Sequence, residues 1–78
     1  MDRKTILSQI EKIFREVLDD ERITLTEDTT AKDVEKWDSL THILIIVGME
    51  KLFNLRFTST EIHDWKNVKA MIDSIQSK

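Results

Sequence analysis

A serine lies within the densest cluster of charged and aromatic residues in this sequence, Asp33-Val34-Glu35-Lys36-Trp37-Asp38-Ser39-Leu40. A serine hydroxyl can act as a nucleophile, accept a modifying group or cap a helix. His42 is three residues from Ser39 and could serve as a base for nucleophilic catalysis. However, Gly48 is the only glycine, so the glycine pattern of a nucleophile elbow is absent, and 78 residues leave little room for a deep substrate pocket. These features disfavour a hydrolase.

Thiol and metal chemistry find no support in the encoded side chains. The chain has no cysteine, which excludes disulfides, thiolate metal ligands and a thiol nucleophile. His42 and His63 have no metal-ligand spacing to each other or to a carboxylate cluster, so we expect them to be structural or surface residues. Any thiol chemistry would therefore require an added group.

The composition predicts one small helical domain spanning residues 1–78. One glycine and no proline argue against an all-β fold, which needs many tight turns. The net charge of -3 and the lack of a basic recognition helix disfavour binding to DNA or other nucleic acids. No segment has the apolar core of a signal peptide or the length of a membrane span, so the expected location is the cytoplasm.

Helical periodicity and capping residues predict four helices. Ile6, Ile10, Ile13, Phe14 and Val17 recur at helical spacing, which indicates a first helix over roughly residues 3–18. A second helix is expected from Ser39 to about Phe53. A short third one follows the capping-box spacing of Thr58-Ser59-Thr60-Glu61, and a fourth starts near Asn67. The predicted fold is all-α, a four-helix bundle with a long first loop and a short third helix.

The segment of residues 19–38 shows no sustained helical period and is predicted to be a loop. Connections of this length are uncommon in compact domains and tend to be functional. Between Leu25 and Ser39 the acidic residues outnumber the two lysines by three, which equals the formal net charge of the whole chain. The apolar residues expected to pack this loop onto the core are Leu25, Ala31, Val34 and Trp37.

The predicted second helix carries two apolar stripes, although one stripe suffices for a helix that packs on a core. The first stripe comprises Ile45, Ile46, Met49 and Phe53, and the second comprises Leu40, Ile43, Leu44 and Val47. The pattern by itself favours a central helix that contacts all three others. The alternative is that the second stripe is a docking face for partner proteins, because exposed apolar patches usually mark such faces.

Asp38-Ser39-Leu40 resembles the modification motif of acyl carrier proteins. The longer string, from Asp33-Val34 through Trp37-Asp38-Ser39-Leu40, is similar to the version found in many specialised, D-alanyl and modular-synthase carriers. The resemblance covers the whole chain, because an amphipathic helix and an acidic loop precede the motif, and an apolar helix, a short helix and a final helix follow it. The resemblance implies a four-helix bundle of acyl-carrier type.

The resemblance further implies that Ser39 is esterified by 4′-phosphopantetheine from coenzyme A. The thiol of that arm would carry acyl groups as thioesters between enzymes of fatty-acid, polyketide or related specialised biosynthesis, which would account for the missing cysteine. The chain would not itself be an enzyme. Its partners would be a phosphopantetheinyl transferase, an acyl-loading enzyme and an acyl-consuming enzyme, and a monomer is expected.

The roles implied for individual residues centre on Ser39. Asp38 would assist the transferase through its magnesium ion, and can also cap the helix. Trp37 is expected to pack the loop against the core. The predicted docking residues are Leu40, Ile43, Leu44, Val47 and Glu50.

The sequence also departs from the pattern of many fatty-acid carriers. Thr41 and Leu44 occupy positions where such carriers often place acids, and Glu50 is offset by Lys51. We therefore expect docking to depend on apolar burial, and a specialised rather than a housekeeping carrier. A cavity for a lipid chain could be lined by Ile45, Ile46, Met49, Trp65 and Ile72, but an ordinary packed core is slightly favoured.

Two alternatives remain open at the level of sequence. The first is a D-alanyl or aminoacyl carrier, which the loading enzyme would distinguish from an acyl carrier. The second is an unmodified helical protein-interaction module with the same fold, against which the intact Ser39-Leu40 motif argues. Because bulky Trp65 fills space near the end of the third helix, small or polar cargo fits the sequence as well as a long fatty chain does.

Overall fold

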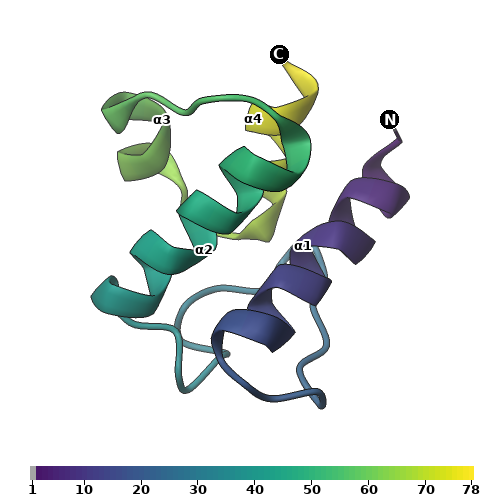
Figure 1. The fold of residues 1–78 in the computed structure, drawn as a ribbon, viewed down its shortest axis with the longest axis vertical. Coiled ribbons are helices and arrows are strands. Elements are labelled where there is room, and N and C mark those ends of the chain that lie inside the picture. The colour runs from purple at the N-terminus through teal and green to yellow at the C-terminus, as the bar shows by residue number, and fades with distance from the viewer. Residues whose placement is uncertain (1) are drawn as a thin grey trace.

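The computed structural model describes residues 2–78, and all regular elements in that range are helices. They are α1 (Arg3–Val17), α2 (Ser39–Phe53), α3 (Ser59–Asp64) and α4 (Val68–Gln76), as Figure 1 shows. The all-α fold with four helices, a long first loop and a short third helix is confirmed. No helix in the described range is long and apolar enough to cross a membrane.

Each helix is directly preceded by a polar N-cap residue whose side chain accepts a hydrogen bond from a backbone N–H of the first turn. The capping box predicted at Thr58 and Glu61 is present, and a second one joins Asp38 to Thr41 at the start of α2. α2 is terminated by its C-cap residue Asn54, which adopts the left-handed conformation with φ 52°. The caps explain why the predicted helix starts agree with the structure.

The core is formed mainly by α1 and α4. α1 buries Ile6, Ile10, Ile13 and Phe14, whereas α4 buries Val68, Met71, Ile72 and Ile75. α2 contributes only Ile45 and Met49 as buried residues, and Ile46 and Phe53 pack partly buried against the core. α1 and α2 approach closely at Gly48, because a Cβ there would lie 3.0 Å from Cγ2 of Ile13.

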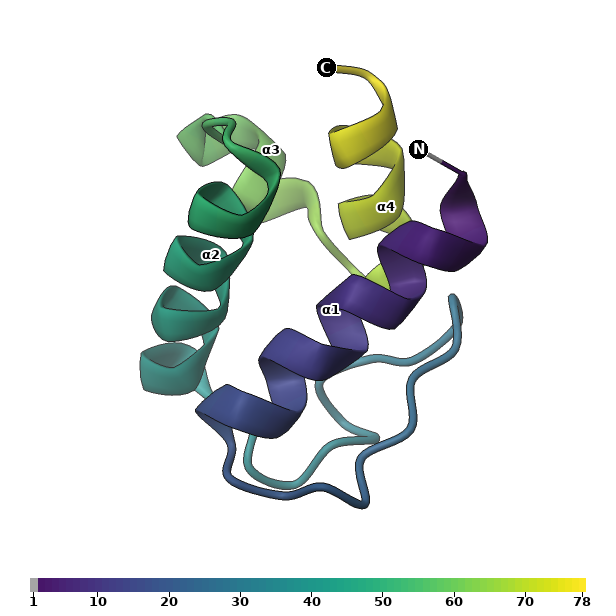
Figure 2. The same ribbon diagram turned by 45° about the vertical axis from the view of Figure 1, so that its right-hand side comes forward.

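α2 is not the central, nearly enclosed helix that its apolar pattern favoured. Its second stripe faces solvent, with relative exposures of 69% for Leu40, 58% for Ile43, 50% for Leu44 and 42% for Val47. In Figure 2, α2 lies along one side of the molecule, and α1 runs diagonally below α4 towards the lower end of α2. The burial favoured by the pattern alone is not observed, because within residues 2–78 no other helix covers this side of α2, and this exposure agrees with the alternative of a docking face.

The long loop is held by hydrogen bonds from two helices. On the polar side of α1, Glu11 Oε2 accepts from Leu25 N at 2.9 Å and Arg15 Nε donates to the Ile23 carbonyl at 2.8 Å. At the start of α4, the free N–H groups of residues 68 and 69 donate to the carbonyls of residues 29 and 27, at 3.0 and 2.8 Å. These contacts hold the loop against the bundle without regular secondary structure.

The predicted inward residues of this loop are mostly confirmed. Leu25 and Trp37 are buried and Val34 is half-buried, but Ala31 is exposed. Thr29 is the buried residue in this part of the loop, and its Oγ1 accepts a hydrogen bond from Thr26 N at 2.9 Å. The expectation for Ala31 was wrong because a hydrogen-bonded turn, rather than apolar spacing, directs this part of the loop.

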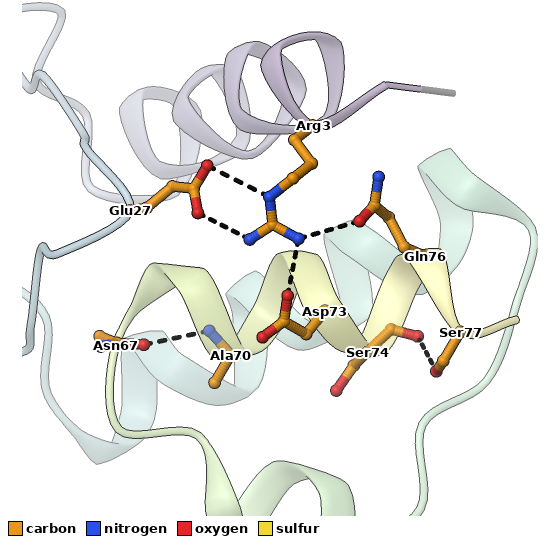
Figure 3. Close-up of polar contacts among 8 residues, drawn as sticks. All are labelled: Arg3, Glu27, Asn67, Ala70, Asp73, Ser74, Gln76 and Ser77. Carbon is orange, nitrogen blue, oxygen red and sulfur yellow. Dashed lines mark hydrogen bonds and ion pairs between the residues drawn. The ribbon is translucent and has the colours of Figure 1, made fainter.

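Arg3 joins the start of α1 to the loop and to α4 (Figure 3). Its guanidinium donates to both carboxylate oxygens of Glu27, at 2.6 and 3.3 Å, and to Asp73 Oδ1 at 2.6 Å. The hydrogen bond from Arg3 holds the pKa of Glu27 below its ordinary value. This network lies at the end of α1 where both termini emerge, whereas α2 begins near the opposite end of the molecule (Figures 1 and 2).

Candidate functional site

Ser39 is the first residue of α2 and is exposed to solvent. In the described part of the chain, no hydrogen bond involves its hydroxyl. A helix start presents free N–H groups and the positive end of the helix dipole, which stabilise an anion there by about 0.3–1 kcal/mol. The hydroxyl is therefore accessible and lies where a negatively charged substituent would be stabilised.

Asp38 is the N-cap of α2. Its Oδ1 accepts from Leu40 N at 3.0 Å and from Thr41 N at 2.9 Å, and it lies 3.2 Å from Thr41 Oγ1. These bonds, chiefly the one from the backbone of Thr41, hold the pKa of Asp38 below its ordinary value, so the carboxylate is ionised at neutral pH. Within residues 2–78 no hydrogen bond uses Oδ2, so Asp38 caps the helix with one oxygen and leaves the other without an intramolecular partner.

Thr41 is a site residue whose contribution sequence reasoning missed. Its hydroxyl accepts from Asp38 N at 2.8 Å and lies 2.9 Å from the Lys36 carbonyl, to which it can donate. These contacts fix the turn that enters α2. The signal was available, because a hydroxyl residue three positions after a capping aspartate has capping-box spacing.

His42 does not pair with Ser39, contrary to the catalytic alternative. Its Nδ1 accepts a hydrogen bond from Trp37 Nε1 at 3.0 Å, so a neutral His42 carries its proton on Nε2. The two rings stack with centroids 5.9 Å apart, and burial lowers the pKa of His42. His42 thus has the structural role that was expected, while His63 is exposed.

Trp37 packs the end of the loop against the core, as predicted. It is buried, and its ring meets Phe14 edge to face with centroids 4.8 Å apart. On its other side it lines an open surface recess of about 310 Å³ next to Ser39. The recess is lined by Ala31, Trp37, Asp38, Ser39, His42, Trp65 and Lys66.

The exposed apolar stripe of α2 starts directly after Ser39. We name it the outer face and define it as Leu40, Ile43, Leu44 and Val47. The spacing of these residues places them on one side of the helix. A contiguous exposed apolar surface of this kind is typical of protein-binding sites.

Glu50, also predicted to contact partners, has an intramolecular contact. It is half-buried, and its Oε2 accepts a hydrogen bond from Phe57 N at 3.0 Å. This bond stabilises the segment between α2 and α3. A role of Glu50 in docking stays a prediction.

Comparisons with known proteins add an independent observation. No family model matches the chain, and no curated protein matches it. Among solved structures, the chain is similar to the solution NMR structure of holo acyl carrier protein from Geobacter metallireducens, with a TM-score of 0.85. The sequences are 39% identical, and the match covers 92% of this chain and 83% of that chain. With this agreement in fold and sequence, the resemblance carried by the motif at Ser39 is confirmed, and the chain belongs to the acyl carrier protein family.

Proposed function

We propose that this chain carries acyl groups as thioesters on a 4′-phosphopantetheine arm attached to Ser39, shuttling them between enzymes of fatty-acid, polyketide or related specialised biosynthesis. The observation that carries the proposal is the exposed Ser39 hydroxyl, free of hydrogen bonds within residues 2–78, at the start of α2 in a member of this family. The similar solved structure is of a holo protein, which supports attachment of a prosthetic group here too. The chain acts as a carrier and its partners perform the chemistry.

The residues around Ser39 fit such an arm. A phosphodiester on the hydroxyl would lie at the start of a helix of 15 residues, whose free N–H groups favour an anion. The thiol of the bound arm supplies the thioester chemistry that a chain without cysteine cannot supply. Asp38 adds a like charge beside the phosphate, which favours a divalent cation brought by the transferase.

Attachment would require a base from outside the chain. In this step Ser39 Oγ forms a bond to the phosphorus of coenzyme A that bears the pantetheine, and the bond to the departing 3′,5′-adenosine bisphosphate breaks. The serine proton must leave, and the nearest histidine, His42, uses Nδ1 to accept from Trp37. A phosphopantetheinyl transferase would therefore supply the base, while Asp38 would help to place the magnesium ion.

Partner enzymes would dock on the outer face. Removing its apolar side chains from water would favour a complex through the hydrophobic effect. The only acid of α2, Glu50, is followed directly by Lys51, so charge steering should contribute little. We therefore propose a specialised carrier, with a loading enzyme and an acyl-consuming enzyme as partners.

Intact-protein mass spectrometry tests the attachment. The protein is incubated with coenzyme A, magnesium and a broad-specificity phosphopantetheinyl transferase. We expect a single phosphopantetheine adduct that is lost in Ser39→Ala and kept in Ser8→Ala, which removes an exposed serine of α1 instead. Absence of an adduct on the folded wild-type protein would favour the unmodified interaction module.

Two further assays address the finer parts of the proposal. Complementation tests specialisation, because efficient replacement of a housekeeping fatty-acid carrier by this chain would contradict it. Incubation of the holo-protein with acyl- and aminoacyl-adenylating ligases tests the cargo class. Loading by a D-alanyl or other aminoacyl ligase alone would replace the acyl assignment with the aminoacyl one.

A further inference from the structure

Ser39 itself lines the recess, so an arm attached to this residue would bring its cargo there by folding back over the start of α2. Its volume of about 310 Å³ is at the lower end of the range for small-molecule pockets. Trp37, His42 and Trp65 give it an aromatic floor, while Asp38 and Lys66 provide opposite charges. Any role of the recess in holding cargo rests on the proposed function, because the cargo reaches it through the arm on Ser39.

The floor of the recess belongs to a longer series of rings, which we name the aromatic row and define as Trp37, His42, Trp65 and Phe57. Successive ring centroids lie 5.9, 6.2 and 4.8 Å apart. His42 belongs to α2, whereas Trp65 is the C-cap of α3 and Phe57 precedes that helix. The row therefore bridges α2 and α3, starting at the end of α2 that carries Ser39 and reaching Phe57, whose N–H donates to Glu50 near the other end of α2.

Hydrogen bonds hold both indoles of the row in place. Trp37 Nε1 donates to His42 Nδ1 at 3.0 Å, and Trp65 Nε1 donates to Ser74 Oγ of α4 at 2.9 Å. A rotation of either indole away from its site would break one of these bonds. Each indole therefore has one hydrogen bond that opposes its rotation out of the row.

The row separates the recess from the core. Trp37 lines the recess and also meets Phe14, which is fully buried. Three apolar core residues that could line a lipid cavity have 0% relative exposure. They are Ile45 and Met49 of α2 and Ile72 of α4. A chain attached at Ser39 would have to displace two hydrogen-bonded indoles to reach them from this side.

We propose that the recess is the resting site of the cargo and that the aromatic row keeps the cargo at the surface. The site favours short acyl groups, aromatic ones foremost, over long alkyl chains. Flat aromatic faces bind planar groups by stacking and edge-to-face contact. Long alkyl chains would stay largely in water, because the recess is small and the core behind it is closed.

Loading with two different acyl groups tests the inference. The apo-protein is loaded with benzoyl or octanoyl phosphopantetheine from the matching coenzyme A conjugate, and mass spectrometry confirms each adduct. NMR then compares each loaded form with the unloaded holo-protein. We expect benzoyl to shift the indole Nε1–H signals of Trp37 and Trp65, and octanoyl to leave the methyl signals of Ile45 and Ile72 unchanged.

The outcomes separate this inference from the function on which it rests. No adduct at all would remove the proposed function and the inference with it. A confirmed octanoyl adduct that shifts the core methyl signals of the wild-type protein would overturn the inference alone. Unchanged indole signals in the benzoyl form would overturn the recess as the resting site.

A variant of the row provides the reverse test. Trp65→Leu keeps the position apolar but removes the indole, so octanoyl should now shift the Ile72 methyl signals and its thioester should react several-fold more slowly with hydroxylamine. Phe53→Leu, at a half-buried aromatic residue outside the row, is the matched control and should behave as the wild type. If Trp65→Leu does not fold, Ser74→Ala removes only the hydrogen bond to the indole and should increase entry of octanoyl. Octanoyl that stays outside in both row variants would show that the row does not exclude it.

Discussion

α1 and α2 have the same length, 15 residues, but they distribute apolar side chains in different ways. α1 buries four apolar residues in the core, and on its polar side Glu11 and Arg15 hold the long loop. α2 buries only Ile45 and Met49 and leaves the four residues of the outer face in water. Half-exposed apolar side chains gain less hydrophobic free energy on folding than buried ones do, and clusters of them are typical of binding surfaces. The comparison assigns stability mainly to α1, whereas α2 carries the proposed docking face.

The first residues of α1 and α2 also differ in the number of intramolecular contacts that their side chains make. Arg3 at the start of α1 makes hydrogen bonds to Glu27, Asp73 and Gln76. Ser39 at the start of α2 is exposed, and within residues 2–78 its hydroxyl makes no hydrogen bond. The start of α1 is therefore bound to the long loop and to α4, whereas the start of α2 is accessible to solvent.

The largest effect should come from the same substitution made on both helices. Ile10→Ala removes a side chain with 0% exposure from α1, whereas Ile43→Ala removes one with 58% exposure from α2. We expect Ile10→Ala to lower the free energy of unfolding by about 2–5 kcal/mol, since it leaves a cavity in the core. Ile43→Ala should change it by less than about 0.5 kcal/mol. Urea unfolding followed by circular dichroism measures both, and equal losses would contradict the division between the helices.

A charge on the outer face should affect recognition instead of stability. Leu44→Asp places a carboxylate at the centre of the outer face, which a partner would have to desolvate. We expect kcat/KM of the transferase or loading enzyme to fall about tenfold or more, equivalent to about 1.4 kcal/mol or more. Ser8→Asp, on the exposed side of α1, is the control and should leave kcat/KM unchanged. A similar loss in both variants would show that net charge, and not the outer face, determines docking.

The contact between the two helices provides a smaller and more specific effect. Alanine is favoured over glycine within a helix by about 1 kcal/mol, but a Cβ at Gly48 would lie only 3.0 Å from Ile13 Cγ2. We expect Gly48→Ala to lower the free energy of unfolding by about 1 kcal/mol, since overpacking outweighs the gain in helix propensity. In an Ile13→Ala background the same substitution should stabilise the protein. A double-mutant cycle measures this coupling, and additive effects would indicate that α2 shifts to accept the methyl group.

Local signals predicted most of the fold. The periodicity of α1 and α4 and the capping residues Asp38, Thr58 and Asn67 are properties of short segments, so the helix starts agree closely with the structure. The motif around Ser39 is equally local. For this reason the predicted modification site lies at the start of α2, on the surface, as the family resemblance implied.

What sequence reasoning missed depends on contacts between segments. The apolar pattern taken alone favoured burial of the outer face, because composition does not show whether another helix covers it, whereas the family resemblance indicated a docking surface there. The Phe57 N to Glu50 hydrogen bond and the aromatic row need the positions of α2 and α3 relative to each other. The error at Ala31 has a different cause, since the turn formed by Thr26 and Thr29 reverses which residue of the loop points inward.

The smallest difference between the helices concerns pH, because α2 carries His42 and α1 has no histidine. Burial lowers the pKa of His42 in the folded protein, whereas the unfolded chain has a pKa of about 6.5. Below about pH 6.5 the unfolded state therefore binds more protons, and folding stability falls as the pH decreases towards the folded pKa. Protonation at Nδ1 would also remove the acceptor for Trp37 Nε1. We expect the wild-type Tm to fall between about pH 7.5 and about pH 5.5.

His42→Asn separates this effect from the carboxylates, because the amide oxygen can replace Nδ1 as an acceptor and does not titrate. Its Tm should depend less on pH over the same range than that of the wild type. His63→Asn removes the exposed histidine of α3 and should follow the wild type. Asp38 shares the recess with His42, but its lowered pKa keeps it ionised throughout this range, so its charge is constant in all three proteins. If wild type and His42→Asn lost Tm in parallel, the proton uptake would belong to another group, and the Trp37–His42 contact would have no part in the response to acid.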